Sequence, residues 1–240
     1  MIKCHLPALI LFCLCSAACS RASPASKDSL PALLVRLDSL QHTNSPGRYF
    51  AALYLSVSRE AATLFLPLAN KRERELMEKL SLHFAGYFFQ AAEACRKDEG
   101  LPAPWQASFG NDGSSPARQL LYGINAHING DIWKALTTCF TPAELAELKP
   151  VYKRYYQVLK RQYDLFYDLT LVQSGQFRRL HTFSLGFSRH YGKYLVKVWR
   201  KRQFRLAEMY FSNERRFERK RKKVERKAAR TDKLISRYIR

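Results

Sequence analysis

The chain has 240 residues, of which 47% are hydrophobic and 13% aromatic, enough apolar material to bury a sizeable core in one or two domains. Its formal net charge is +21 at pH 7, and its ten glycines and ten prolines exclude collagen-like and low-complexity classes. Residues 1–150 carry 15 Lys and Arg against 13 Asp and Glu, whereas residues 151–240 carry 26 against 7. The excess positive charge therefore belongs to the C-terminal part of the chain.

The N-terminal segment has the pattern of an export signal. A positively charged start precedes the apolar run 6–14, which is too short to span a bilayer as a helix, and small residues at 16–18 lead to Cys19. This arrangement resembles a bacterial lipoprotein signal, which implies lipidation of Cys19. We predict a signal peptide at 1–18, a polar tether at 19–28, and an exported protein anchored in the bacterial cell envelope, with the leaflet left open.

The rest of the chain has the apolar spacing of helices. Runs at intervals of three and four residues cover 30–40, 50–65 and 76–91, and further helices open at Pro116 and at the capping box that starts at Thr141. The helix from this capping box runs on to residue 175, and another helix or pair follows it. No stretch alternates with the period of a strand. We predict an all-α fold: a single multi-helix domain of about seven helices over residues 29–212, followed by a basic C-terminal helical extension, the tail 213–240.

Loop signals separate the third and fourth helices. Trp105 and Phe109 are expected there as isolated apolar anchors. The two cysteines of the body, Cys95 and Cys139, either form one bridge in an oxidising compartment or remain two buried thiols.

The segment 121–131 reads Leu-Tyr-Gly-Ile-Asn-Ala-His-Ile-Asn-Gly-Asp. It resembles the signature of a functionally uncharacterised family of bacterial helical proteins, which carry a G-I-N-A-H-I-N-x-D core at the positions of residues 123–131. Weaker matches flank it, among them a basic and aromatic stretch around Trp199. The resemblance implies an all-helical fold and a marked site, and it implies no reaction.

The residues of this signature raise a question of burial. On an α-helix His127 and Asp131 lie one turn apart on the apolar stripe, and Asn125 and Asn129 form a second polar pair with the same spacing. Burying an unpartnered amide or imidazole costs about 1–3 kcal/mol, so these groups need partners, water or a metal. In one interpretation they hydrogen-bond to each other and to neighbouring helices and only fix the packing. In the other, His127 and Asp131 ligate a divalent metal ion or act as a base with its orienting group.

A metal site would need further ligands from other helices. The candidates are His83, His181, His190, Glu60 and Asp164 or Asp168. The sequence contains no HExxH, GxSxG, P-loop or GxGxxG motif, so the common hydrolase and nucleotide-binding signatures are absent.

Two features of the C-terminal part concern partners. The aromatic residues of the segment 152–167 either line a ligand groove or form a seam between core and surface. The tail carries a dense run of cations, which we predict to bind an anionic surface. These residues are Arg219, Lys220, Arg221, Lys222, Lys223, Arg226 and Lys227.

The predicted export determines which polyanions this cationic run can meet. Outside the cytoplasm these are anionic lipid headgroups and envelope polymers, so no nucleic acid is expected as a partner. The leading hypothesis is a membrane-tethered binding protein; the alternative is a metal-assisted hydrolase of a lipid or envelope substrate at His127 and Asp131. The oligomeric state stays open.

Overall fold

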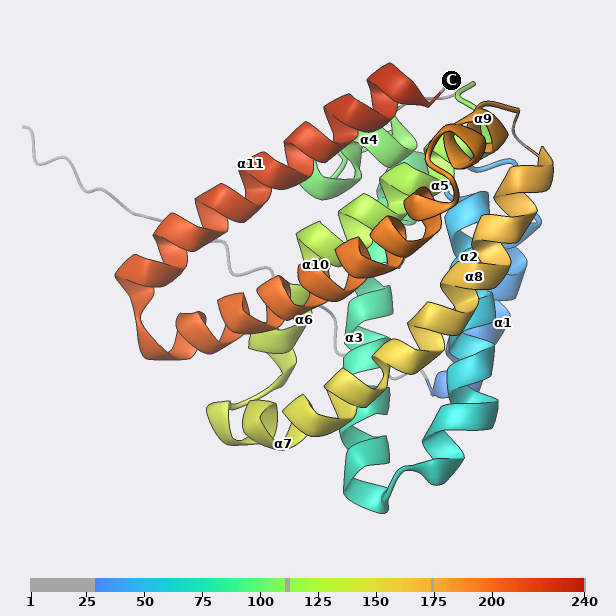
Figure 1. Ribbon diagram of the computed structural model, residues 1–240. Coiled ribbons are helices and arrows are strands. Elements are labelled where there is room, and N and C mark those ends of the chain that lie inside the picture. The colour runs from blue at the N-terminus through green and yellow to red at the C-terminus, as the bar shows by residue number, and fades with distance from the viewer. Residues whose placement is uncertain (1–28, 111–112, 174, 240) are drawn as a thin grey trace, which may run out of the picture.

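The computed structural model describes residues 29–110, 113–173 and 175–239, and within these ranges every regular element is a helix (Figure 1). The predicted signal peptide, the tether and the lipidated Cys19 lie outside the described residues. The all-α prediction is confirmed. The described part has more helical segments than the expected seven because π-helical or bent turns divide several continuous helices.

The N-terminal half consists of a helical hairpin and a long third helix. Ser29 caps the first helix through its side chain, and Asn70 caps the third by accepting from the amide of Glu73 at 2.9 Å. The elements of this half are α1 (Leu30–Gln41), α2 (Arg48–Glu60), the π-helical η1 (Ala61–Phe65), the 3-10 turn η2 (Leu66–Leu68) and α3 (Lys71–Arg96).

The middle of the chain contains the signature segment and the helices on either side of it. Thr141 and Glu144 form the predicted capping box, and the helix continues through Pro150 before it bends at Tyr155. Trp105 and Phe109 are core residues in two short helices instead of isolated loop anchors. The elements are η3 (Ala103–Trp105), α4 (Gln106–Phe109), α5 (Pro116–Asn125), the π-helical η4 (Ala126–Asp131), α6 (Ile132–Cys139), α7 (Pro142–Arg154) and α8 (Tyr156–Gln173).

The C-terminal elements are α9 (Gly175–Phe183), α10 (Phe187–Ser212) and α11 (Glu214–Tyr238). The predicted start of the tail at residue 213 coincides with Asn213, which caps α11. The helix then folds back over the body, where it packs against α10, α5 and η4 (Figure 1). Its apolar residues Phe217, Val224 and Ile235 are buried, so α11 is part of the packed domain.

The core is divided between two large apolar clusters. One joins α3, α6, α7 and α10, and the other joins α1, α2, α3, η3 and α5. Cys139 is a free thiol in the first cluster and its Sγ donates to the carbonyl of Ala135 at 2.7 Å, so it does not bridge to Cys95. The segment η4 lies between the two clusters, and this position places its side chains at the centre of the molecule. Among the described residues, no helix is both long and apolar enough to cross a membrane.

Candidate functional site

The signature segment forms the middle of one long helix, α5–η4–α6. Its residues Ala126–Asp131 adopt a π-helical turn, in which the backbone hydrogen bonds join residues five apart instead of the four of an α-helix. Such turns disturb the regular backbone ladder and are often found at functional sites. They also change the direction in which side chains leave the helix, so the positions of His127 and Asp131 have to be taken from the structure.

Two glycines of the signature let neighbouring elements approach this helix closely. A Cβ at Gly123 would lie 2.7 Å from the Cβ of Phe50, and a Cβ at Gly130 would lie 2.4 Å from the Cβ of Pro104. Both distances are far below van der Waals contact. The two glycines therefore bring α2 and η3 against the π turn, and with η3 comes the indole of Trp105.

Asp131 is fully buried and is held by this indole. Its carboxylate accepts from Trp105 Nε1 at 2.8 Å and from Lys134 Nζ at 3.5 Å. Burial raises the pKa of Asp131 to about 6, against the opposing effects of the lysine and the indole. Its partners are thus a neighbouring element and its own helix.

Asn125 and Asn129 connect the π turn to α11. Asn129 Nδ2 donates to Asn125 Oδ1 at 2.9 Å, and Asn125 Nδ2 donates to the carbonyl of Ala228 at 3.0 Å and to Asp232 Oδ1 at 2.7 Å. Burial also raises the pKa of Asp232 to about 6. The packing interpretation describes these two asparagines well, because their hydrogen bonds fix one helix to another.

His127 differs from the other polar residues of the signature. Its ring stacks on Phe84 with centroids 3.3 Å apart and contacts the rings of Phe50 and Tyr54. Neither ring nitrogen has a hydrogen-bond partner among the described residues, so His127 does not bond to Asp131. Burial lowers the pKa of His127 well below its ordinary value, so that the imidazole is neutral at pH 7.

The structure places the other candidate metal ligands in separate contacts. Glu60 accepts from Arg161 and Gln162, whereas Asp164 and Asp168 both bind Arg189. Among the described residues, no group of three or more His, Cys, Asp or Glu side chains is arranged to hold a metal ion. The metal site at His127 and Asp131 stays a prediction for which the described residues supply no third ligand.

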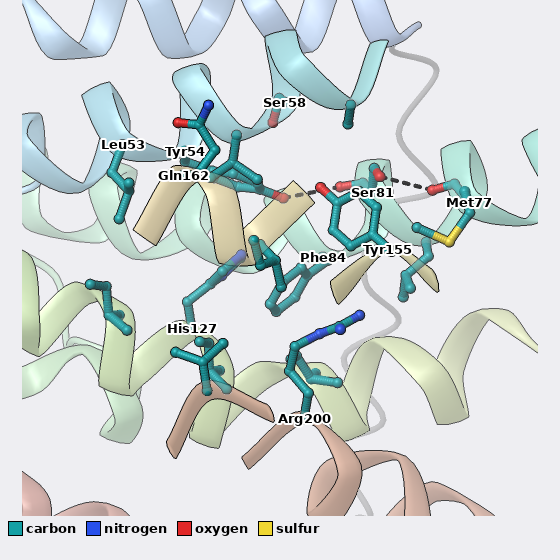
Figure 2. Close-up of a pocket in the computed structure, with 18 of the residues that line it drawn as sticks. Leu53, Tyr54, Ser58, Met77, Ser81, Phe84, His127, Tyr155, Gln162 and Arg200 are labelled. Carbon is teal, nitrogen blue, oxygen red and sulfur yellow. Dashed lines mark hydrogen bonds between the residues drawn. The ribbon is translucent and has the colours of Figure 1, made fainter. Parts of the chain in front are cut away.

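A cavity of about 140 Å³ lies beside His127 (Figure 2). Its lining is mainly apolar and aromatic, and it includes Tyr152, Tyr155, Tyr163 and Phe166 from the segment expected to form either a groove or a seam. Besides these three tyrosines, the polar members of the lining are Tyr54, Ser58, Ser81, His127, Gln162 and Arg200.

Several of these polar groups already have protein partners. Ser81 donates to the carbonyl of Met77 at 2.8 Å, the Tyr54 hydroxyl donates to the Ser81 carbonyl at 3.4 Å, and Gln162 bonds to Glu60 and Ser56. His127 has no such partner in the part of the chain that the structure describes. Figure 2 shows it entering the cavity from the same side as Arg200, with Tyr54, Ser81 and Gln162 opposite.

Arg200 is the functional candidate that the sequence patterns did not single out. It is only 5% exposed, one of its amino groups donates to the carbonyl of Tyr152 at 3.0 Å, and its guanidinium carbon lies 4.0 Å from the centre of the Tyr152 ring. No Asp or Glu of the described residues lies within ion-pair distance of it. The available signal was the basic and aromatic match around Trp199, which marks this stretch without showing its burial.

A second hollow adjoins the cavity at Arg200 and Tyr152, which line both. It is a surface groove of about 470 Å³ between α7 and α10. The charged side chains along it are Lys149, Lys153, Lys197, Lys201, Arg205 and Glu208. One acid therefore faces five exposed or half-exposed cations, and Lys149 already pairs with Glu208 at 2.6 Å.

The comparison with family models matches residues 28–238 to a family of unknown function, DUF5995. The chain belongs to this family. No curated protein and no solved structure is significantly similar to the chain. The DUF5995 match extends through α11, in agreement with the packing of that helix on the body.

The predicted anionic-surface residues of the DUF5995 chain lie along α11. Most of them are exposed, whereas Arg221 is half-buried and pairs with Glu218 at 2.7 Å and Glu225 at 2.6 Å. The pKa of Lys227 is lowered, first by the charge of Arg202 on α10 and also by neighbouring cations of α11. Cations of two helices are thus crowded together at this surface.

Proposed function

We propose that this protein binds an amphipathic anion, with the apolar part of the ligand in the cavity and its acidic group at Arg200. The observation that carries the proposal is a buried guanidinium without a carboxylate partner among the described residues. Burying an unpaired charge is strongly unfavourable, and Arg is the side chain best suited to bind a carboxylate or phosphate through two parallel hydrogen bonds. A ligand anion would supply the missing partner.

The volume of the cavity sets the size of the apolar part. An apolar cavity of about 150 Å³ accommodates benzene, so about 140 Å³ fits a group of roughly six carbon atoms. A longer ligand would continue past Arg200 into the cationic groove, where its polar end would meet the exposed lysines. Both parts of the site thus favour a molecule with one apolar end and one acidic end.

His127 would take part as a neutral group. Because its pKa is lowered, one ring nitrogen donates a hydrogen bond and the other accepts one at pH 7. Both nitrogens lack partners among the described residues, which makes them available to a carbonyl, a hydroxyl or a protonated oxygen of the ligand.

Calorimetric titration with three six-carbon probes tests this proposal. Hexanoate and hexyl phosphate each carry an acidic group on a six-carbon chain. Hexanol has a chain of the same length with an uncharged hydroxyl group. We expect the wild-type protein to bind an anionic probe at least tenfold more tightly than hexanol, since a hydrogen bond to a charged group contributes about 1.5–3 kcal/mol. The two anions separate a carboxylate ligand from a phosphate ligand.

Substitutions at Arg200 provide the structural control. Arg200→Gln should abolish the preference for the anion, Arg200→Lys should keep part of it, and both should still bind hexanol if the cavity is intact. Arg74→Gln, an exposed arginine on α3, should leave all three affinities unchanged. Equal binding of hexanoate, hexyl phosphate and hexanol by the wild-type protein would contradict the proposal.

We also propose that the protein is exported, lipid-anchored at Cys19 and attracted to an anionic envelope surface by α11. The crowding of Lys227 by Arg202 supports this second role, because an anionic surface would relieve the repulsion. Cell fractionation tests the location. Co-sedimentation with anionic vesicles at rising salt tests the attraction, which should weaken as salt increases and on replacement of the exposed cations Lys222, Lys223 and Arg226 by glutamine.

The metal-assisted hydrolase remains the alternative function, and the unpartnered nitrogens of His127 are the observation that favours it. Metal analysis of the purified protein, with His127→Ala and Asp131→Ala beside it, is the test. Stoichiometric metal that both substitutions remove would support this alternative, and its absence would count against it.

A further inference from the structure

The turn between α9 and α10 exposes three large apolar side chains. Phe183 is 87% exposed, Leu185 95% and Phe187 66%, and together they form the end of a helical hairpin. Leu185 and Gly186 have positive φ angles of 48° and 79°, which reverse the chain sharply between the two helices. We call residues 183–187 the apolar turn.

The apolar turn continues into an aromatic stripe along α10. Phe187, Tyr191 and Tyr194 are spaced four and three residues apart and therefore share one face of the helix. Their rings are stacked, with centroids 6.3 Å and 6.5 Å apart, and the two tyrosines are 50% and 59% exposed. Tyrosine is enriched where a protein meets the boundary between lipid headgroups and acyl chains.

The sequence around the apolar turn contains no acidic residue. From residue 169 to residue 207 there is no Asp or Glu, whereas nine residues are Lys or Arg. Arg189 and Lys193 pair with acids of α8, so their charges are compensated locally. The exposed cations that remain beside the turn and along α10 are Arg178, Arg179, Lys197, Lys201 and Arg205.

We propose that the apolar turn inserts into the surface of an anionic lipid bilayer, with the tyrosine stripe at the headgroup level and the flanking cations on the phosphates. Interfacial elements of this kind combine an apolar face, which enters about 5–10 Å, with surrounding Lys and Arg. The charge pattern selects the partner, because an anionic surface complements a segment, residues 169–207, that has nine cations and no acid, and the two nearby acids of α8 already pair with Arg189 and Lys193. Lys197, Lys201 and Arg205 also line the groove beside Arg200, but insertion of the apolar turn needs neither a ligand in the cavity nor the basic face of α11.

The size of the patch argues against a second copy of the chain as the partner. Three large side chains present roughly 750 Å² at most, since an aromatic side chain buries about 150–250 Å². A stable protein interface needs about 800 Å² from each partner. Two like-charged copies would also repel each other through the same cations. A bilayer does not face these limits, because apolar insertion and electrostatic attraction add together.

Tryptophan reporters in the full chain test the proposal. Leu185→Trp places an indole in the apolar turn, and Leu68→Trp places one at a comparably exposed residue, 87% accessible, in η2 between α2 and α3. The connection between α2 and α3 lies at the bottom of Figure 1, whereas α9 lies at the top. Each protein is mixed with vesicles of phosphatidylcholine alone or of phosphatidylcholine with added phosphatidylglycerol. In both kinds of vesicle the phosphatidylcholine acyl chains carry bromine at carbons 6 and 7. Emission is compared with that of the wild-type protein, which has three native tryptophans.

We expect the bromine atoms to quench about half or more of the emission added by Leu185→Trp in the anionic vesicles, because insertion reaches the upper acyl chains. The emission added by Leu68→Trp should be unaffected. Unquenched Leu185→Trp emission in vesicle-bound protein would overturn the proposal, as would equal quenching of both reporters. A concentration-dependent blue shift of Leu185→Trp without vesicles would assign the turn to self-association and would also overturn it.

Discussion

Replacing Asp131 by asparagine should make the protein more stable at neutral pH, although it removes a charged residue from the signature. The buried carboxylate has a pKa of about 6, compared with 3.8 for a solvated aspartate. Because the folded-state pKa is raised, the stabilising contribution is complete below the unfolded pKa and is lost as the pH rises through 6. The amide introduced by Asp131→Asn cannot ionise, and its Oδ1 can still accept from Trp105 Nε1.

The size of this effect follows from the shift in pKa. Each pKa unit corresponds to 1.36 kcal/mol, so the wild-type protein loses about 2.5 kcal/mol of unfolding free energy between pH 4 and pH 8 through Asp131 alone. Asp131→Asn should therefore match the wild type at about pH 4 and exceed it increasingly at higher pH. The lowered pKa of His127 acts in the opposite sense, with stability lost as the pH falls below its unfolded value, but it is common to both proteins.

Urea unfolding followed by circular dichroism at intervals from pH 4 to pH 8 measures this difference. Gln90→Asn, an exchange of neutral side chains at an exposed residue, serves as the control and should give a stability difference from the wild type that does not vary with pH, because neither side chain ionises. If the difference between Asp131→Asn and the wild type were also constant with pH, the raised pKa and the burial that explains it would both be wrong.

Three further predictions concern the same region. Gly130→Ala should destabilise the protein by about 1–3 kcal/mol, because the new Cβ meets Pro104 at 2.4 Å, whereas Gly175→Ala, which meets no atom within 4 Å, should be neutral; equal thermal shifts would contradict this. Asn125→Ala should increase amide hydrogen exchange in α11 more than in α3, since it removes two hydrogen bonds to α11, and unchanged exchange in α11 would refute this prediction. His127→Leu should increase the unfolding free energy by about 1 kcal/mol or leave it unchanged, because it replaces an imidazole whose nitrogens lack partners among the described residues; a loss of several kcal/mol would show that His127 serves packing.

The helical class and most helix positions could be predicted because they depend on local patterns. The capping box at Thr141 and the apolar runs of α1 and α3 reflect residues close together in the chain, and the structure contains them where they were expected. The signature was also visible as a set of polar residues that burial would make expensive. That expectation is met, since Asn125, His127, Asn129 and Asp131 are all buried.

The arrangement within the site could not be predicted, because it depends on a π turn and on contacts between distant segments. Helical spacing of 3.6 residues suggests that His127 and Asp131 are mutual partners, but Asp131 bonds to Trp105, 26 residues away, and His127 turns to the cavity. Arg200 lies 48 residues from the carbonyl that it contacts. In the sequence it is one of many basic residues, and its burial depends on the packing of α10 against distant segments such as α7.

The polar groups around the cavity are unfavourable for stability, and this helps to separate a binding site from ordinary packing. A core selected for stability alone would place an aliphatic side chain at position 127 and a long apolar one at position 200, where each would fill space without a buried donor or charge. Both asparagines have at least one hydrogen bond within the protein, although Asn129 Oδ1 has no partner among the described residues, so most of the buried polar groups of the turn are satisfied by packing contacts. On the two elements that meet at the cavity, the described residues provide no hydrogen-bond partner for His127, and they provide a carbonyl and an aromatic ring but no carboxylate for Arg200. A ligand that carries an acidic group on a small apolar body would satisfy both at once.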